Sequence, residues 1–326
     1  MKKKYILPIL LSGLLLASCG TNADDSPSSS SPSEVEPAPV EKIITGRGKP
    51  SNTDGAQYSL YVDSETNMIY EKNKAYAAPS SSLKRAADES KWIYTNCKAG
   101  ANFTKESPVA DALRNALLST NVTLKANDHT VFNQGSFHMD NTSVAYIAYN
   151  VGNVLFKSEE PGYEGFDNAI IRAYSLYDID NDSYKFYMNE GSSFVDRTSY
   201  INDGDPSHEG LVSRFITRCF NNYLELSCNF PLCDKILEEL DNFTVYDKVY
   251  TLPKDIVGTS DIYTNMYGEG EFKFSNLSFK LSSDGSSLDY FEFRFSFETN
   301  DKSVSVVEDL HIEVTNLRTT SFAIPQ

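Results

Sequence analysis

An unbroken alternation of phenylalanine and polar residues near the C-terminus is the feature that most constrains the fold. It reads Phe-Glu-Phe-Arg-Phe-Ser-Phe-Glu over residues 291–298. Successive side chains of a strand point to opposite faces of a sheet, so the pattern predicts a strand with one phenylalanine face and one polar face. Leu310, Ile312 and Val314 alternate with polar residues in the same way. Such runs are typical of half-buried antiparallel strands.

Two local signals refine this picture. Asp284 and Gly285 lie between two alternating runs and predict a tight hairpin turn. The alternation in residues 272–281 changes phase at Asn276, which predicts a β-bulge.

Few helices are expected. Ser107 can cap a helix that begins at Pro108. A second helix is predicted from about Ser207 and a shorter one after Pro231, each with one apolar stripe. Such helices would lie on a sheet. The expected fold class is therefore α+β, a strongly curved antiparallel sheet with helices gathered on its concave face.

The N-terminus is typical of an export signal. Lysines at positions 2–4 precede an apolar stretch, residues 5–16, of about a dozen residues. A membrane-spanning helix would need roughly 20 apolar residues. The stretch leads into Leu-Ala-Ser-Cys-Gly at residues 16–20, which resembles the lipobox of bacterial lipoproteins. The resemblance implies a signal peptide of residues 1–18, cleavage before Cys19, and a diacylglyceryl lipid with acyl chains such as palmitate on Cys19.

The expected location is thus the extracellular face of the cell membrane, with the chain held by its lipid anchor. Removal of three lysines from 29 cationic side chains leaves 26 against 45 acidic ones, a formal charge of about −19. Nucleic acid would be repelled and is not an expected partner. Residues 19–43 are rich in serine, proline and acidic residues, a composition that predicts a disordered tether.

Residues 44–98 carry a recognisable pattern of glycines, aromatic residues and an aspartate. Its members are Gly46, Gly48, Pro50, Tyr61, Asp63, Tyr70 and Trp92. The pattern resembles a small β-hairpin module of bacterial surface proteins, collagen-like proteins and phage tail fibres. The resemblance implies strands at residues 58–62 and 68–72, a tight turn between them, and Trp92 covering an aromatic face. It implies a spacer without a catalytic role.

The chain departs from that module in three places. Ala56 and Gln57 replace a Gly-Asp pair, Asn67 replaces the turn glycine, and residues 75–90 are an insertion before Trp92. Asparagine tolerates positive φ, so the second change is mild. Because of the insertion, the pattern does not fix where Trp92 lies relative to the hairpin.

Residues 99–326 contain three loose motifs. A helix leads into a strand at residues 112–124, a short helix precedes a strand at residues 237–250, and residues 312–320 form a last strand that ends in two threonines. Together they resemble the LolA-like lipoprotein domain of Firmicutes surface lipoproteins. The resemblance implies an unclosed barrel with helices on the concave side, which in several relatives takes a hydrophobic ligand. A phenylalanine-rich sheet fits such a cavity and fits an ordinary core equally well.

Patterns for catalysis and metal binding mostly fail. Residues 178–189 begin like a calcium loop but place Ser183 and Asn189 where glycine and glutamate are needed, so a polar turn is favoured. The acidic segment at residues 203–209 contains His208 but no second histidine at the spacing of metal ligands. This favours a role in capping the next helix over a metal site. The other histidines, isolated in sequence, are His129, His138 and His311. No catalytic residue, metal or cofactor is expected.

Four cysteines remain besides Cys19, namely Cys97, Cys219, Cys228 and Cys233. Outside the membrane they could form two disulfides in any of three connectivities. The pair Cys228 and Cys233 is favoured because the two residues closely bracket Pro231. A buried free thiol at Cys219 and a zinc site with His208 are the alternatives.

The sequence favours a surface-anchored, non-enzymatic lipoprotein that binds a hydrophobic or envelope-derived ligand in a half-barrel cavity. One alternative is a structural or adhesive surface protein that recognises a glycan or a protein. An enzyme with residues scattered along the chain is the other. The expected partners are the membrane, through the lipid on Cys19, and a hydrophobic ligand.

Overall fold

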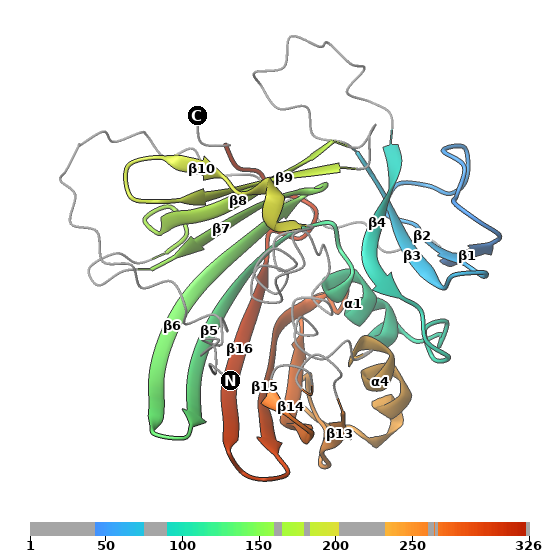
Figure 1. Cartoon of the computed structure of the whole chain (residues 1–326). Helices are drawn as coiled ribbons and strands as arrows, with labels where there is room; N and C mark the ends of the chain where they lie inside the picture. The colour runs from blue at the N-terminus through green and yellow to red at the C-terminus, as the bar shows by residue number, and fades with distance from the viewer. Residues whose placement is uncertain are drawn as a thin grey trace.

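The structure is a computed structural model that describes residues 43–74, 90–159, 165–178, 183–201, 232–259, 264 and 267–323. Strands dominate this part of the chain and form a four-stranded sheet and a twelve-stranded sheet (Figure 1). We call them the small sheet and the large sheet.

The small sheet has the order β1-β2-β3-β4. Its strands are β1 (Ile43–Gly46), β2 (Leu60–Asp63), β3 (Met68–Lys74) and β4 (Ser90–Lys98). β1 pairs with β2 in parallel, and the other pairs are antiparallel. Asn67 lies in the turn between β2 and β3 with φ of 59°. An asparagine can occupy this left-handed position without the steric cost that bulky residues meet.

The large sheet has the order β10-β9-β8-β7-β6-β5-β16-β15-β14-β12-β11, and β13 also pairs with β14. All its pairs are antiparallel. Its strands are β5 (Asn121–Gln134), β6 (Phe137–Asn150), β7 (Asn153–Ser158), β8 (Ile170–Asp178), β9 (Ser183–Asn189), β10 (Phe194–Asp196), β11 (Thr244–Tyr246), β12 (Val249–Thr251), β13 (Ile256–Gly258), β14 (Gly270–Leu281), β15 (Leu288–Thr299) and β16 (Val304–Thr315).

The last strand, β16, lies in the middle of the large sheet. It pairs on one side with β15, its neighbour in sequence, and on the other with β5, near the start of the large sheet. The β16–β5 register runs from Val304 opposite Gln134 to Thr315 opposite Thr123. The sheet is therefore completed only when the end of the chain returns to strands made much earlier.

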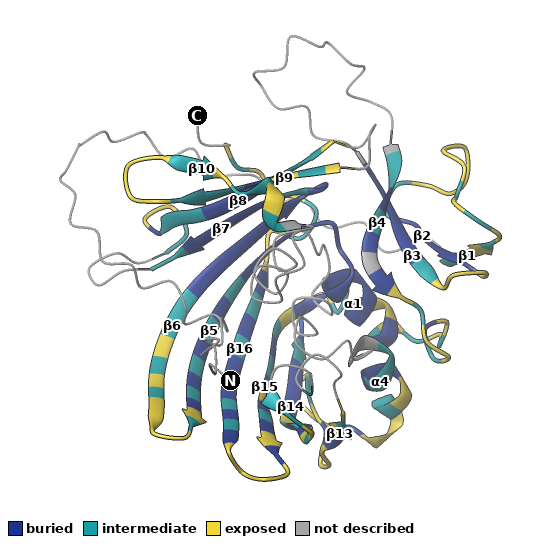
Figure 2. Cartoon of the chain, viewed as in Figure 1, coloured by how far each residue is buried: buried dark blue, intermediate teal, exposed yellow. Residues whose placement is uncertain are grey.

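The alternation in β15 is confirmed. Its four phenylalanines are buried, at 0 to 5% exposure, whereas Arg294 and Glu298, which alternate with them, are exposed. We call the phenylalanine side the inner face of the large sheet and the opposite side its outer face. Figure 2 shows the resulting bands of buried and half-buried residues along β5, β16 and β15. The inner face supplies most of the apolar core.

Three local predictions are also confirmed. Asp284 and Gly285 form the hairpin turn between β14 and β15, with Gly285 at φ of 78°. The register of β14 against β15 shifts on either side of Asn276, as a bulge requires. Ser107 caps its helix by accepting a hydrogen bond from the backbone N–H of Ala110 at 3.0 Å.

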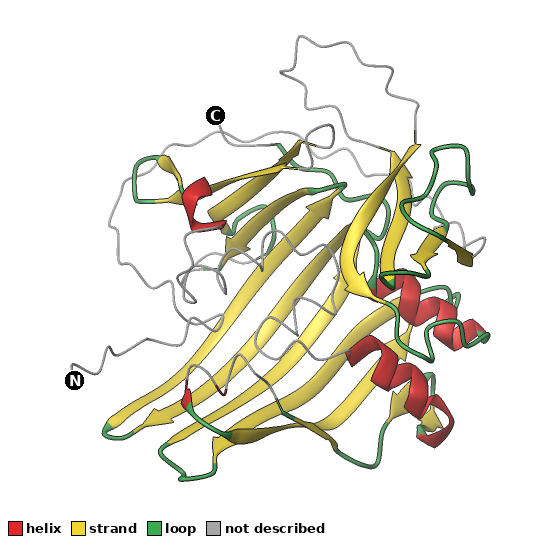
Figure 3. Cartoon of the chain, turned by 45° about the vertical axis from the view of Figure 1, so that its right-hand side comes forward, coloured by secondary structure: helices red, strands yellow, loops and turns green. Residues whose placement is uncertain are grey.

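The expected α+β class is wrong, because the described chain is mostly β. Its α-helices are α1 (Pro108–Leu117) and α4 (Leu232–Glu239), and its 3-10 turns are η2 (Thr198–Ile201) and η3 (Leu240–Asn242). Figure 3 shows α1 and α4 beside one end of the large sheet, not spread over a concave face. The two α-helices have only 10 and 8 residues, whereas alternating strands extend from β5 to β16 and set the architecture. The helix expected from Ser207 lies outside the described residues.

No helix in the described part of the chain combines the length and the apolar character that crossing a membrane requires.

A buried polar contact joins the two sheets. Glu71 of β3 is only 2% exposed, and one of its oxygens, Oε2, accepts the backbone N–H and the hydroxyl of Thr120 at 2.6 and 2.5 Å. Thr120 comes directly before β5, and its hydroxyl accepts a hydrogen bond from Asn73 at 3.2 Å. Arg318, which follows β16 in sequence, stacks on the ring of Tyr58 with 4.2 Å between the guanidinium and the ring centre. The small sheet is thus fixed to the large one by buried groups from both.

Candidate functional site

The aromatic residues singled out in the small sheet gather on one side of it. The ring of Tyr61 lies 5.8 Å from Trp92 and 6.3 Å from Tyr70, both edge to face. Trp92 donates its indole N–H to the carbonyl of Ser51 at 2.8 Å, and the Lys72 ammonium lies 5.6 Å from its ring. Tyr61 and Tyr70 are buried in these contacts, and Trp92 is half-buried.

The glycines of the module serve backbone geometry. Gly46 ends β1 where a Cβ would overlap the phenol of Tyr61. Gly48 has φ of 71°, a conformation that favours glycine. Pro50 follows in a half-buried position.

Asp63 holds the turn between β2 and β3. Its carboxylate accepts the hydroxyl of Thr66 at 2.5 Å, the backbone N–H of Glu65 at 3.0 Å and the backbone N–H of Gly48 at 2.8 Å. Hydrogen bonds from Thr66 and from these backbone groups lower the pKa of Asp63. The residue is therefore a structural anion with its acceptor sites occupied.

The disulfide state is described for one cysteine. Cys97 of β4 is buried at 1% exposure and is disulfide-bonded. The side chains of Cys19, Cys219, Cys228 and Cys233 lie outside the described residues. The connectivity, including the favoured pair of Cys228 with Cys233, stays a prediction.

Most of the two acidic loops considered for metal binding also lies outside the described residues, as does His208. Tyr177 of β8 and Tyr184 of β9 are paired, so the first loop does connect two antiparallel strands. Within the described ranges, no three histidine, cysteine, aspartate or glutamate residues come together as a metal site.

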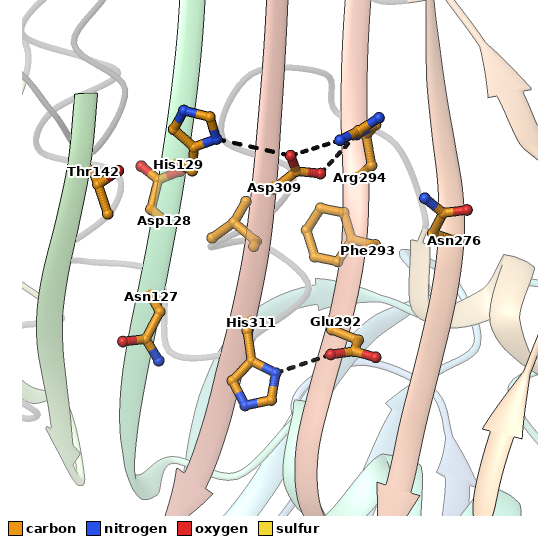
Figure 4. A pocket seen from close by; sticks show the side chains of 11 residues that line it. Asn127, Asp128, His129, Thr142, Asn276, Glu292, Phe293, Arg294, Asp309 and His311 are labelled. Carbon is orange, nitrogen blue, oxygen red and sulfur yellow. Dashed lines mark hydrogen bonds and ion pairs between the residues drawn. The ribbon is translucent and has the colours of Figure 1, made fainter. Parts of the chain in front are cut away.

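A depression of about 370 Å³ opens on the outer face of the large sheet, and we call it the outer-face site. Five adjacent strands, β6, β5, β16, β15 and β14, line it (Figure 4). The lining residues are Asn127, Asp128, His129, Thr142, Asn276, Glu292, Phe293, Arg294, Asp309, Leu310 and His311. Asp128, Phe293 and Leu310 alternate with these residues along the same strands, and their buried side chains point to the inner face.

The strand register explains why these side chains meet. Residues directly opposite one another in an antiparallel pair have neighbouring side chains on the same face. The pairing aligns a first row across β6, β5, β16 and β15, made of Thr142, His129, Asp309 and Arg294. Two residues along β16, it aligns a second row made of Asn127, His311 and Glu292.

The first row is organised around Asp309. Arg294 donates to it in a fork, with Nε to Oδ1 at 2.7 Å and Nη2 to Oδ2 at 2.8 Å. This pairing lowers the pKa of Asp309 and raises the pKa of Arg294, because each charge stabilises the other. His129 lies between two carboxylates, with Nε2 at 2.9 Å from Asp140 and Nδ1 at 4.0 Å from Asp309. Figure 4 shows the second of these contacts and the Arg294 fork.

The second row is organised around Glu292. Its Oε2 lies 3.0 Å from Nδ1 of His311, and its Oε1 accepts the hydroxyl of Ser278 at 2.7 Å. The ring of Tyr290 lies 4.9 Å from the His311 ring and borders the site. Both rows therefore contain a histidine placed beside a carboxylate.

Three neutral side chains complete the site. Asn127, Thr142 and Asn276 come from β5, β6 and β14, and their side chains form no hydrogen bond within the described residues. Asn276 lies at the bulge with φ of 54°, which carries its amide to the edge of the depression (Figure 4). Bulges frequently redirect a side chain beside a functional site.

The arrangement offers two kinds of chemistry. A histidine beside a carboxylate can act as a general base toward a bound hydroxyl or a water molecule. Thr142 carries the only hydroxyl among the lining residues, and no cysteine or serine is among them. Hydrogen-bond donors and acceptors, in contrast, are abundant on all five strands.

Sequence reasoning missed this site. His129 and His311 are isolated along the chain but not across the sheet. One signal was present, because His311 occupies a polar position of an alternating strand and must point away from the apolar face. Its neighbours depend on strand register, which no local pattern gives.

Comparison with known proteins provides little further guidance. No family model matches the chain, and no curated protein matches it. Among solved structures, the crystal structure of a DUF1329 family protein from Desulfovibrio piger covers 67% of this chain and 96% of that chain. The sequence identity is 10% and the TM-score is 0.19. A TM-score this low supports no conclusion, so the resemblances drawn from sequence rest on their motifs alone.

Proposed function

We propose that this chain is a surface-anchored, non-enzymatic binding protein that receives a polar ligand in the outer-face site. One observation carries the proposal. The depression is lined by polar side chains from five strands, three of them neutral and without a hydrogen bond among the described residues. A polar patch of this shape on an otherwise regular sheet favours a ligand that forms hydrogen bonds.

The anchor remains part of the proposal. The lipobox resemblance at residues 16–20 supports lipidation of Cys19, and two or more acyl chains hold a protein stably at a membrane. Metabolic labelling with a palmitate analogue tests this part. The wild-type chain should be labelled and sediment with membranes, whereas Cys19→Ala should remain unlabelled. Equal labelling of both chains would refute the anchor.

The ligand now proposed differs from the hydrophobic one expected from the sequence. The phenylalanines that suggested a hydrophobic cavity pack against one another, with 6.1 Å between the ring centres of Phe272 and Phe295 and 5.4 Å between those of Phe274 and Phe295. They serve as core in this part of the chain. A hydrophobic ligand stays a prediction without an observation that favours it.

Histidine resonances offer a direct test, since the chain has 4 histidines. His129 and His311 line the outer-face site, whereas His138 lies outside it, beside Asn133. The full mature chain, labelled at histidine, is titrated with mixtures of neutral sugars, amino acids, nucleosides and short peptides. We expect at least one class to shift the imidazole signals of His129 and His311 and to leave those of His138 unchanged.

The assignment of each signal comes from single His→Gln variants. If no class of compound moves the signals of His129 and His311, the outer-face site is not a binding site and the proposal fails. Shifts that include His138 equally would reflect a general change of pH or medium, and would also count against the site.

A further inference from the structure

The charged side chains of the outer-face site are each engaged by a neighbouring side chain. Arg294 is held by Asp309 in a two-bond fork, Glu292 is held by His311 and Ser278, and His129 lies against Asp140. Beside the site, Lys125 and Glu313 form a further pair at 3.2 Å. A charged ligand would have to displace a protein side chain that already pairs with its binding partner. This competition reduces the net binding free energy of the ligand.

The groups left to meet a ligand are neutral. The amides of Asn127 and Asn276 and the hydroxyl of Thr142 each offer both a donor and an acceptor. A ligand hydroxyl has the same double character and can donate to one such group while it accepts from another. These three side chains therefore match a molecule that presents several hydroxyls.

The three neutral groups are widely spaced. They lie on β5, β6 and β14, and β6 is four strand intervals from β14 in the sheet order. At the usual separation of neighbouring strands this is roughly 19 Å. A single small molecule cannot reach both ends, whereas an extended chain of sugar units can.

An aromatic edge completes the match. Tyr290 and His311 pack together with their ring centres 4.9 Å apart at the border of the site. The C–H face of a sugar ring is apolar and packs well on an aromatic surface, while its hydroxyls point sideways to polar groups. Hydroxyl-binding amides beside an aromatic edge suit both parts of such a ring.

We infer that the outer-face site binds a neutral oligosaccharide laid across β6, β5, β16, β15 and β14. This inference rests on the proposed function, because it names the class of ligand for the same site. These pairings orient the donors and acceptors of Arg294, Asp309, Glu292 and the histidines. The neutral side chains of Asn127, Thr142 and Asn276 make the contacts that select the ligand.

The test is a glycan array that carries neutral, uronic-acid-containing, sulfated and amino-sugar oligosaccharides, probed with the full mature chain. Binding to neutral glycans is then measured by calorimetry for three proteins. They are the wild type, the double variant N127A/T142A, and N133A. Asn133 lies on the same face of β5 but outside the depression, so N133A is a matched asparagine control.

We expect a neutral glycan to bind the wild type and N133A equally, and to bind N127A/T142A about 30-fold more weakly, as loss of two neutral hydrogen bonds implies. If charged glycans bind better than their neutral counterparts, or if no glycan binds while other compounds shift His129 and His311, the inference is wrong and the proposed function stands. If nothing binds and neither histidine responds to any compound, both fail.

Discussion

The small sheet and the outer-face site both combine charged and aromatic side chains, yet they are held in different ways. In the small sheet, the Lys72 ammonium donates to the carbonyls of Asn52, Asp54 and Gly55 at 2.6 to 2.9 Å, all within 20 residues of it. In the outer-face site, charged side chains instead pair with side chains of the neighbouring strand, and those of the paired residues are 37 to 59% exposed. Buried contacts to the backbone fix a shape, whereas exposed pairs on a finished sheet add chemistry at little gain in stability.

Breaking the junction between the sheets should have the largest effect. Glu71→Ala removes the acceptor of the buried Thr120 N–H and the charge that faces Arg318. We expect a loss of about 3 kcal/mol in unfolding free energy, typical for removal of one partner of a buried polar pair. Urea unfolding followed by fluorescence of Trp92, the only tryptophan, reports on the small sheet.

Glu65→Ala is the matched control, because Glu65 pairs with Arg47 on the surface, where the two side chains are 52% and 83% exposed. It should change the unfolding free energy by less than about 1 kcal/mol. Equal effects of the two substitutions would show that the buried contact does not hold the sheets together.

Loss of the Lys72 ammonium should cost somewhat less. Lys72→Met removes three charge-assisted hydrogen bonds to backbone carbonyls and the ammonium that lies over the Trp92 ring. Water can reach part of this loop, so we expect a loss of about 2 kcal/mol. The Trp92 fluorescence transition is again the measurement, with the exposed Lys98→Met as control. A change no larger than that of the control would mean that the loop closes without Lys72.

The pH dependence sharpens the same comparison, because Glu71 is buried and titratable. Burial raises its pKa above the ordinary 4.5, although Arg318 and Thr120 act in the opposite direction. The folded state therefore holds this proton more tightly than the unfolded chain does. The contribution of Glu71 to stability falls as pH rises from about 4.5 through its folded-state pKa.

Glu71→Gln keeps an acceptor for Thr120 and removes the titration. As pH rises through this window, the unfolding free energy of the variant should increase relative to that of the wild type. Parallel urea titrations at several pH values measure this difference. If the difference in unfolding free energy between variant and wild type stays constant with pH, or falls as pH rises, the pKa of Glu71 is not raised.

Local features of this fold could be predicted from sequence because each depends on a few adjacent residues. The alternation at residues 291–298, the turn at Asp284, the bulge at Asn276 and the cap at Ser107 all follow from backbone chemistry within one or two turns of chain. The expected balance of helix and strand is wrong, because a helix cap marks where a helix begins but does not report what share of the chain is helical.

The outer-face site could not be predicted because it depends on pairings between distant strands. His129 and Asp309 are neighbours only because β16 returns to pair with β5 in one register. A shift of that register by one residue would send His311 and Asp309 to the inner face and scatter both rows. Nothing adjacent to either residue in sequence specifies the choice, which follows from burial of the whole apolar face.

The smallest expected change in stability lies in the outer-face site itself. Arg294→Gln removes both hydrogen bonds to Asp309, yet the two side chains are 48% and 40% exposed, so water and salt already weaken the pair. The unfolding free energy, followed by circular dichroism of the large sheet, should fall by less than about 1 kcal/mol. Arg47→Gln, which breaks the exposed pair with Glu65 in the small sheet, is the matched control. A loss above about 2 kcal/mol at Arg294 would instead assign the fork a structural role, since exposed pairs do not contribute that much. His129 also contacts Asp309. If the variant keeps its stability but the ligand-induced shift of His129 changes, the Arg294–Asp309 pair serves binding and not folding.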